Sequence, residues 1–189
     1  AETIYRKVLQ GNPKHSEALR LLGLLAHQTG NSEQGINLIL QAINAQPENV
    51  EAHFNLGIIK LDHNLAGEAI GAFRAALSIS PKNYACLVNL GNALVIAEDF
   101  SEAIKQSNLA LEIDPDNVEA LSNLGNALSK SGKLTDAMSI LRRTVLLRPN
   151  DSQLFNNLGI IEQTIGLIES ANQTYEEALR INPQCQRAE

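Results

Sequence analysis

The chain has 189 residues and a formal net charge of −6, and 44% of its residues are hydrophobic. An acidic chain without a run of lysine and arginine lacks the basic stripe that contacts a nucleic-acid backbone, so we expect no nucleic-acid partner. The sequence has no stretch of about 18 uninterrupted apolar residues and no basic-then-apolar leader, so we expect neither a membrane span nor a signal peptide.

Every proline of the chain falls on one ladder with a spacing of 34 residues. The ladder consists of Pro13, Pro47, Pro81, Pro115, Pro149 and Pro183. A glycine follows each of the first five prolines after ten residues, at Gly23, Gly57, Gly91, Gly125 and Gly159. A fixed period of this length is typical of a helix-turn-helix repeat.

The two ladders share one frame, which divides the chain into repeats. Residues 1–15 are the second helix of a partial repeat, and residues 186–189 begin a further one. Between them we predict complete repeats at 16–49, 50–83, 84–117, 118–151 and 152–185. Each repeat touches mainly its neighbours, so all of them should form one solenoid domain. Because both ends fall inside a repeat, we expect the chain to be a segment of a longer one.

Each repeat contains two amphipathic helices, because its apolar residues recur at spacings of three and four. Repeat 118–151 shows the pattern well. Gly132 is suited to the left-handed conformation that closes the first helix, and Thr135 with Asp136 is predicted to cap the second. The turn between the helices should therefore be short and polar.

The proline ladder marks where each second helix stops, because proline lacks a backbone donor and disfavours helix at the residue before it. A short polar residue follows, which can accept hydrogen bonds from the start of the next first helix. These predicted caps are Asn49, Asn83, Asn117 and Asp151. His15 breaks the set at the corresponding place before residue 16.

The ladder glycines lie inside predicted first helices, where glycine costs roughly 1 kcal/mol relative to alanine. Close contact between the two helices of a repeat would explain the five placements. Small residues on the second helices favour such contact, namely Ala69, Ala103, Ala137 and Ala171.

Numbered from the start of each repeat, glycine at position 8, alanine at 20, a large residue at 24 and proline at 32 resemble the tetratricopeptide repeat. The Asn-Leu-Gly triplets at 55–57, 89–91, 123–125 and 157–159 strengthen the resemblance, which covers the whole chain. It implies an all-α, right-handed superhelical solenoid of antiparallel helix pairs. The chain departs from the pattern at Gly35, Lys60, Ser107, Thr144 and Glu162.

No catalytic or metal-binding constellation is evident. The four histidines show no i, i+4 pairing, and Cys86 and Cys185 show no Cys-x-x-Cys spacing. Uninterrupted repeats also leave no long loop in which catalytic groups could gather. We therefore expect no cofactor, no metal and no enzymatic activity in this segment, although a parent chain could be a transferase.

The inner face of such an array is lined chiefly by its first helices, and position 6 of these helices is asparagine in four consecutive repeats. The residues are Asn55, Asn89, Asn123 and Asn157, with Asn92 and Asn126 one turn further along two of the helices. Such a row of amides can hold the backbone of an extended peptide, since an amide both donates and accepts hydrogen bonds. The row resembles the asparagine ladder of O-linked N-acetylglucosamine transferase. A purely local hydrogen-bonding role is the alternative.

Inner positions 2, 5 and 6 carry one cation, Arg20, and so lack the lysines and arginines of a carboxylate clamp. Phe54, Ile58, Val88, Val95 and Ile96 either add an apolar stretch to the groove or belong to the core. The sequence predicts a cytoplasmic scaffold that binds a protein or an extended peptide on its concave face. The alternatives are the recognition segment of a larger glycosyltransferase or related transferase, and a structural spacer that self-associates through its open ends.

Overall fold

The computed structural model describes residues 1–184, and these residues form eleven α-helices and no strand. In chain order the helices are α1 (Glu2–Gly11), α2 (Ser16–Gln28), α3 (Ser32–Ala45), α4 (Val50–Asp62), α5 (Ala66–Ile79), α6 (Tyr84–Ile96), α7 (Phe100–Ile113), α8 (Val118–Lys130), α9 (Leu134–Leu147), α10 (Ser152–Thr164) and α11 (Ile168–Ile181). The predicted all-α solenoid of helix pairs is confirmed. The predicted start of a further repeat at 186–189 lies outside the described residues, as does Cys185.

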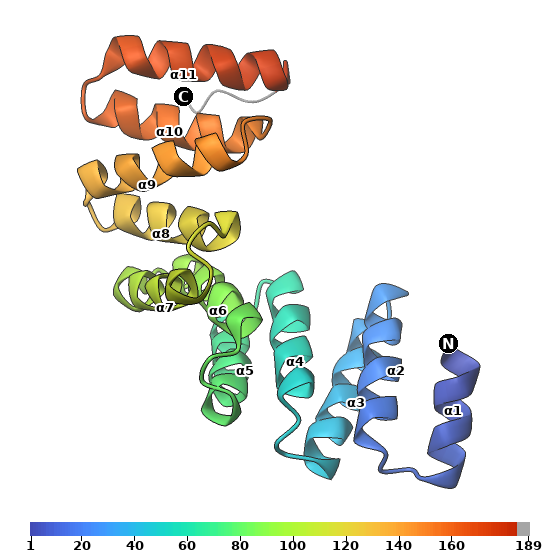
Figure 1. Cartoon of the computed structure of the whole chain (residues 1–189). Helices are drawn as coiled ribbons and strands as arrows, with labels where there is room; N and C mark the ends of the chain where they lie inside the picture. The colour runs from blue at the N-terminus through green and yellow to red at the C-terminus, as the bar shows by residue number, and fades with distance from the viewer. Residues whose placement is uncertain (185–189) are drawn as a thin grey trace. The chain divides into compact units, whose positions relative to one another are not determined.

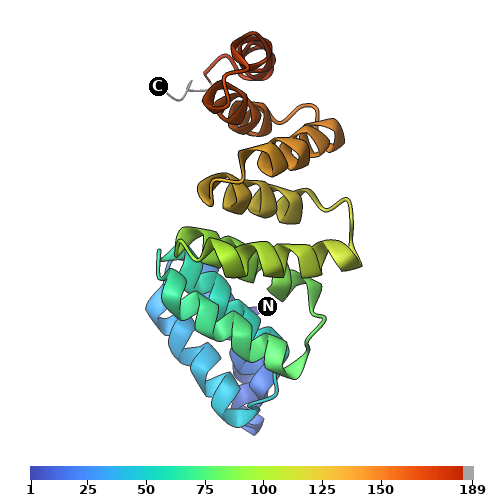
Figure 2. The same ribbon diagram turned by 90° about the vertical axis from the view of Figure 1, so that its left-hand side faces the viewer.

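The helices group into two compact units, residues 1–97 with α1 to α6 and residues from 98 onward with α7 to α11. In the first unit α2 pairs with α3 and α4 pairs with α5, as Figure 1 shows. In the second unit α8 pairs with α9 and α10 with α11, and these pairs are stacked in Figures 1 and 2. The continuity of all repeats in one right-handed solenoid stays a prediction.

The first helices begin where their caps were predicted. The Asn49, Asn83 and Asn117 side chains accept hydrogen bonds from backbone N–H groups three residues later, at 2.9, 3.0 and 2.8 Å, and Asp151 accepts from the Gln153 N–H at 3.1 Å. His15, which lacks the expected side chain, caps α2 all the same, because its Nδ1 accepts from the Ala18 N–H at 3.2 Å. The frame of the repeat is therefore maintained at this boundary.

The second helix of repeat 118–151 starts differently from the prediction. Helix α9 begins at Leu134, and its cap residue, Lys133, makes no capping hydrogen bond through its side chain. The prediction that Thr135 and Asp136 cap this helix is wrong, because both lie inside its first turn. The Asp136 carboxylate still favours this position, since the helix N-terminus carries partial positive charge.

A left-handed residue at position 15 makes the turn between the two helices of every complete repeat. Gly132, predicted for this conformation, has a φ of 82°. The equivalent residues are Gly30, Asn64, Glu98 and Gly166, with φ of 87°, 58°, 61° and 84°. Glutamate has a Cβ that crowds the backbone in this region, whereas glycine does not. Glu98 is therefore the strained member of the set.

Four of the five ladder glycines, Gly23, Gly57, Gly125 and Gly159, lie where a second helix approaches closely, as predicted. A Cβ on Gly125 would lie 2.9 Å from Leu141, one on Gly57 would lie 2.5 Å from the Phe73 ring, and one on Gly159 would lie 2.6 Å from the Tyr175 ring. The residues in contact are therefore the large ones at position 24. The predicted small partners are also buried, with Ala69, Ala103 and Ala137 fully enclosed.

Repeat 16–49 brings the backbones of its two helices into contact, in addition to the Ile39 side chain at position 24. A Cβ on Gly23 would lie 2.8 Å from the Gly35 carbonyl oxygen, and a Cβ on Gly35 would lie 2.7 Å from the Gly23 carbonyl oxygen. Gly35 stands where the other repeats have alanine. The departure from the family pattern thus has a steric reason, because even a methyl group would meet backbone.

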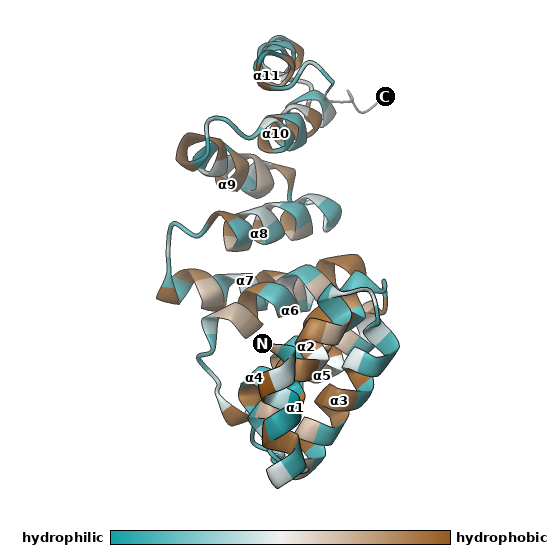
Figure 3. Cartoon of the chain, turned by 90° about the vertical axis from the view of Figure 1, so that its right-hand side faces the viewer, coloured by the Kyte–Doolittle hydropathy of each residue, from teal (hydrophilic) through white to brown (hydrophobic). Residues whose placement is uncertain are grey.

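Leucine, isoleucine and alanine dominate the core between the helix layers. One cluster of the first unit joins Leu19, Ile39 and Ile59 across α2, α3 and α4. In the second unit Leu141, Leu158 and Ile161 join α9 to α10. Figure 3 shows apolar segments alternating with polar ones along the helices, as amphipathic spacing requires. Among residues 1–184, no helix combines the length and the apolar character that a membrane crossing requires.

Replacing Gly35 with alanine should destabilise the protein although alanine matches the other repeats and favours helix. The new methyl group would meet the Gly23 carbonyl and the His27 backbone nitrogen, which are fixed by α2. Gly71→Ala in α5 is the matched control, because a Cβ there has no atom within 4 Å. This control substitution should raise the free energy of unfolding by about 0.5–1 kcal/mol, whereas Gly35→Ala should lower it. Urea denaturation of both variants measures the difference, and equal shifts of the same sign would contradict the steric explanation.

Glu98→Gly should stabilise the protein by roughly 0.5–1 kcal/mol. The relief of left-handed strain in the folded chain exceeds the cost of the larger entropy that glycine has in the unfolded chain. Gly132→Ala at the equivalent position of repeat 118–151 should destabilise by a similar amount. Thermal melting followed by circular dichroism reports both effects. A lower melting midpoint for Glu98→Gly would show that the turn is not strained.

Candidate functional site

The predicted asparagines lie on first helices, and those of the first unit contact one another. In residues 1–97, α4 contacts both α2 and α6. Asn55 lies on α4 and Asn89 with Asn92 on α6, while α2 carries Leu21 at position 6. In the second unit, Asn123 and Asn126 lie on α8 and Asn157 on α10. Each unit is described below by itself.

Asn55 is the most buried of the predicted site residues. Only 7% of its surface is exposed, and its Nδ2 has no hydrogen-bond partner among the described residues. A buried donor without a partner costs about 1–3 kcal/mol relative to a satisfied one. An acceptor from outside the chain would remove this cost, and a peptide carbonyl is such an acceptor.

Asn89 and Asn92 of α6 are the other predicted site residues of the first unit. Asn89 is half-buried, and its Nδ2 donates to the Ala85 carbonyl one turn earlier in α6 at 2.9 Å. This is the local role that the sequence left open for these asparagines. Asn92 is exposed. In this unit α6 therefore offers a locally held amide and an exposed one, beside the buried amide of α4.

The second unit presents half-buried amides on α8 and α10. Asn123, Asn126 and Asn157 all have this intermediate exposure. The Asn157 Oδ1 accepts a hydrogen bond from the Gln153 Nε2 at 3.0 Å, which holds two amides of α10 together. The Gln153 side chain, one turn before Asn157, therefore widens the amide surface beyond the predicted residues.

The apolar residues proposed for the groove are neither core nor fully surface. Phe54, Ile58, Val88 and Val95 are half-buried, and Ile96 is 53% exposed. The Phe54 ring lies 5.8 Å from the buried Phe73 ring, so part of its surface belongs to the packing of α4 on α5. The equivalent first-helix positions of α8 carry Ser122, Asn126 and Ser129 instead. The two units thus differ in the polarity of their first helices.

Arg20, the cation among the inner positions, is already paired. Its Nε donates to the Glu17 carboxylate at 2.9 Å, and this hydrogen bond lowers the pKa of Glu17. The Arg20 guanidinium is therefore engaged by a neighbour on the same helix. This pairing agrees with the absence of a carboxylate clamp from the sequence pattern.

The two charged residues at position 11 each form an ion pair. Lys60 reaches Glu68 of α5 at 2.6 Å. Glu162, only 1% exposed, accepts from Arg142 of α9 at 2.9 Å and from the Thr174 hydroxyl of α11 at 2.7 Å. Burial raises the pKa of Glu162, but the hydrogen bonds from Arg142, Thr174 and Ser170 together hold the pKa below its usual value. The carboxylate stays ionised and joins three helices, which is a structural role.

One histidine links two repeats. The His27 Nδ1 lies 2.9 Å from the Ser32 hydroxyl and its Nε2 lies 2.9 Å from the Asp62 carboxylate, so α2, α3 and α4 meet at this ring. Nothing in the spacing of the histidines predicted the contact. Across residues 1–184, no three His, Cys, Asp or Glu side chains gather in a metal-binding arrangement.

Family models described as tetratricopeptide repeat match residues 28–84, 60–118, 94–158 and 152–185. Among solved structures, the chain is similar to YrrB, described as a TPR protein with an unusual peptide-binding site. The identity is 21%, the match covers 98% of this chain and 95% of YrrB, and the TM-score is 0.84. MamA from Desulfovibrio magneticus RS-1 has 15% identity, 90% and 97% coverage, and a TM-score of 0.84. No curated protein matches the sequence.

The Glu162 ion pair should respond unequally to loss of its two partners. Arg142→Gln leaves a carboxylate that is buried, whereas Glu162→Gln leaves a guanidinium that is half exposed and can be hydrated. Near neutral pH we therefore expect Arg142→Gln to cost about 2–3 kcal/mol and Glu162→Gln about 1 kcal/mol.

The lowered pKa of Glu162 gives the pH dependence its sign. The stabilisation is present above the unfolded-state pKa, near the usual value of 4.5, and is lost as the pH falls through the lower folded-state pKa. The difference between wild type and Glu162→Gln should therefore shrink below pH 4.5. Urea midpoints over this range check it, and a constant difference would contradict the role of the ionised carboxylate.

Proposed function

The chain belongs to the tetratricopeptide repeat family, and we propose that this protein-interaction scaffold binds extended peptide segments through asparagines of its first helices. The proposed residues are Asn55, Asn89, Asn92, Asn123, Asn126 and Asn157. The buried Nδ2 of Asn55 supports the proposal most strongly, because it has no hydrogen-bond partner among the described residues and is suited to a peptide carbonyl.

In the first unit the asparagines are suited to the two polar groups of a peptide backbone. Asn55 contributes a donor, and the Oδ1 of Asn89 contributes an acceptor while its Nδ2 is held by Ala85. The helices that carry them pack side by side, with axes about 8–10 Å apart, which is about three residues of extended peptide. One carbonyl and one N–H of the same segment would therefore meet the two amides. Asn55 must turn outward for this contact, because its Nδ2 is covered.

The asparagines of the second unit are suited to the same contacts with a peptide backbone, and the side chains around them are more polar. The Nδ2 of Asn157 can donate to a peptide carbonyl, since its Oδ1 is the atom occupied by Gln153. Asn126 adds an amide one turn beyond position 6 of α8. Phe54, Ile58 and Val88 of the first unit favour apolar side chains, whereas Ser122 and Gln153 of the second favour polar ones.

YrrB is described as having a peptide-binding site, which agrees with this mode of binding. At 21% identity, the likeness to YrrB supports the fold alone. A recognition role within a larger transferase and self-association through the ends of the stack stay predictions. Neither is favoured by a particular contact in the structure. The cytoplasmic location also stays a prediction.

Alanine at Asn55, Asn89, Asn123 and Asn157 together should weaken peptide binding. Each lost amide contact is worth about 0.5–1.5 kcal/mol, so the fourfold variant should bind at least about tenfold more weakly on an array of capped peptides. Because the contacts are to backbone, the loss should be similar for peptides of different sequence. N-methylation of alternate peptide bonds should weaken wild-type binding in the same way.

Asn108→Ala is the matched control, because Asn108 is an exposed asparagine of α7, a second helix. Its binding should equal that of the wild type. Equal binding by the fourfold variant, with unchanged circular dichroism, would reject the role of the asparagines. Loss confined to a few peptide sequences would reject backbone recognition in favour of side-chain readout.

A further inference from the structure

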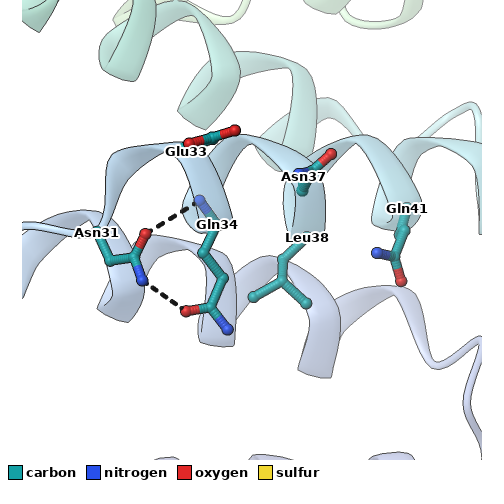
Figure 4. Close-up of a pocket in the computed structure, with 6 residues that line it drawn as sticks. All are labelled: Asn31, Glu33, Gln34, Asn37, Leu38 and Gln41. Atoms are coloured by element: carbon teal, nitrogen blue, oxygen red, sulfur yellow. Dashed lines mark hydrogen bonds between the residues drawn. The ribbon is translucent and has the colours of Figure 1, made fainter.

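A second candidate binding surface lies away from position 6 of the first helices, along the second helix α3. An open hollow of about 330 Å³ is lined by Asn31, Glu33, Gln34, Asn37, Leu38 and Gln41. Figure 4 shows Gln34, Leu38 and Gln41 projecting from one side of α3, with Glu33 and Asn37 on the adjacent side. Four of the six residues are amides, around one aliphatic side chain.

A smaller hollow of about 60 Å³ adjoins the first. Gln34 and Leu38 line both, so they form a common wall. Its other walls come from α2 and α1, including Leu22, Leu25 and Ala26. One water needs roughly 10–15 Å³ of such volume, so this space has room for a few groups of methyl size.

The small hollow has a cause in the repeat pattern. Ala26 stands at position 11, where the other complete repeats carry Lys60, Leu94, Leu128 and Glu162. In the second unit the corresponding Glu162 side chain is 1% exposed and fills the space between α9 and α11, where it contacts Arg142 and Thr174. Alanine is the shortest side chain of the five, and the space beside it stays open.

The polar groups at the small hollow are largely engaged with each other. The Arg6 Nε donates to the Glu2 carboxylate at 2.8 Å, and the Thr29 hydroxyl donates to carbonyls of its own helix at 3.0 Å. Leucine and alanine side chains and the Gln34 amide provide the remaining surface. An ion entering the space would compete with an existing ion pair, whereas an aliphatic group would bury apolar surface without breaking a hydrogen bond.

The larger hollow offers hydrogen bonds that the protein does not use. Asn31 and Gln34 bond to each other through the Asn31 Nδ2 at 3.0 Å, as Figure 4 shows, and the Gln34 Nε2 stays available. Asn37 and Gln41 are exposed and form none of the hydrogen bonds found among residues 1–184. These amides can donate to and accept from a peptide backbone.

We propose that α3 binds an extended peptide whose backbone lies along Gln34, Asn37 and Gln41 and whose valine-sized side chain enters the hollow beside Ala26. From Asn31 to Gln41 the helix rises about 15 Å, which matches four to five residues of extended chain. Glu33 forms none of the ion pairs of residues 1–184, so a basic residue next to the aliphatic one complements the surface. This surface is separate from the asparagines of the proposed function.

The probe is a capped peptide of sequence Gly-Lys-Val-Ser-Gly, titrated into the isotope-labelled full chain while backbone amide resonances are followed by NMR. Binding should shift the resonances of Ala26, Leu38 and Gln41. Tryptophan in place of the peptide valine should abolish these shifts, because the hollow of about 60 Å³ cannot hold an indole.

Ala26→Leu tests the hollow and should keep its fold, since leucine occupies position 11 at Leu94 and Leu128. It should weaken binding of the valine peptide at least about tenfold, because the side chain can no longer be buried. Asn37→Ala with Gln41→Ala tests the backbone contacts without touching the core and should also weaken binding. Asn44→Ala, an exposed amide of α3 outside both hollows, should bind as the wild type does.

Equal affinity of the wild type and the folded Ala26→Leu variant would overturn the proposal. Equal affinity of the valine and tryptophan peptides would do the same. Shifts confined to α4, α6, α8 or α10 would also overturn it, since the peptide would then be bound at the first helices. This result would leave the proposed function intact, and loss of binding by the fourfold asparagine variant leaves the α3 proposal intact in turn.

Discussion

The close approach of the two helices within repeats 16–49, 50–83, 118–151 and 152–185 is the constraint on which the rest of the structure depends. In repeats 50–83, 118–151 and 152–185 a Cβ at position 8 would meet a large side chain at position 24, as Gly57 meets Phe73 and Gly159 meets Tyr175. With the pair held at this distance, the remaining faces of the first helix are available for the next repeat and for partners. The same contact therefore determines where the side chains at positions 6 and 9 lie.

Much of the fold follows from local chemistry that the sequence displays. Proline, the caps at Asn49, Asn83 and Asn117, and the left-handed Gly132 act over a few residues, so their positions predict helix boundaries. The cap of α9 was predicted wrongly at Thr135, because the left-handed Gly132 sets the turn and the helix begins at Leu134. Glu98 adopts this conformation without the glycine that would have marked it.

The candidate sites were less accessible to sequence reasoning, because they depend on contacts between helices. The asparagine pattern identified the amides, but the Asn89 bond to Ala85 and the Asn157 bond to Gln153 depend on side-chain conformations. Likewise Glu162 was recognised as an unusual residue at a core position, whereas its partner Arg142 lies in the preceding repeat. Ala26 gave a signal only in comparison with the other residues at position 11.

Position 11 also has a consequence for the order of the repeats. Along the chain this position carries alanine, a lysine, two leucines and a glutamate. The glutamate, Glu162, accepts a hydrogen bond from Arg142 of the repeat before it, so this interface requires a particular neighbour. Repeat 152–185 placed after a repeat without this arginine would bury the Glu162 carboxylate without its ion-pair partner. The backbone is periodic, yet the side chains at this interface specify which repeat comes before repeat 152–185.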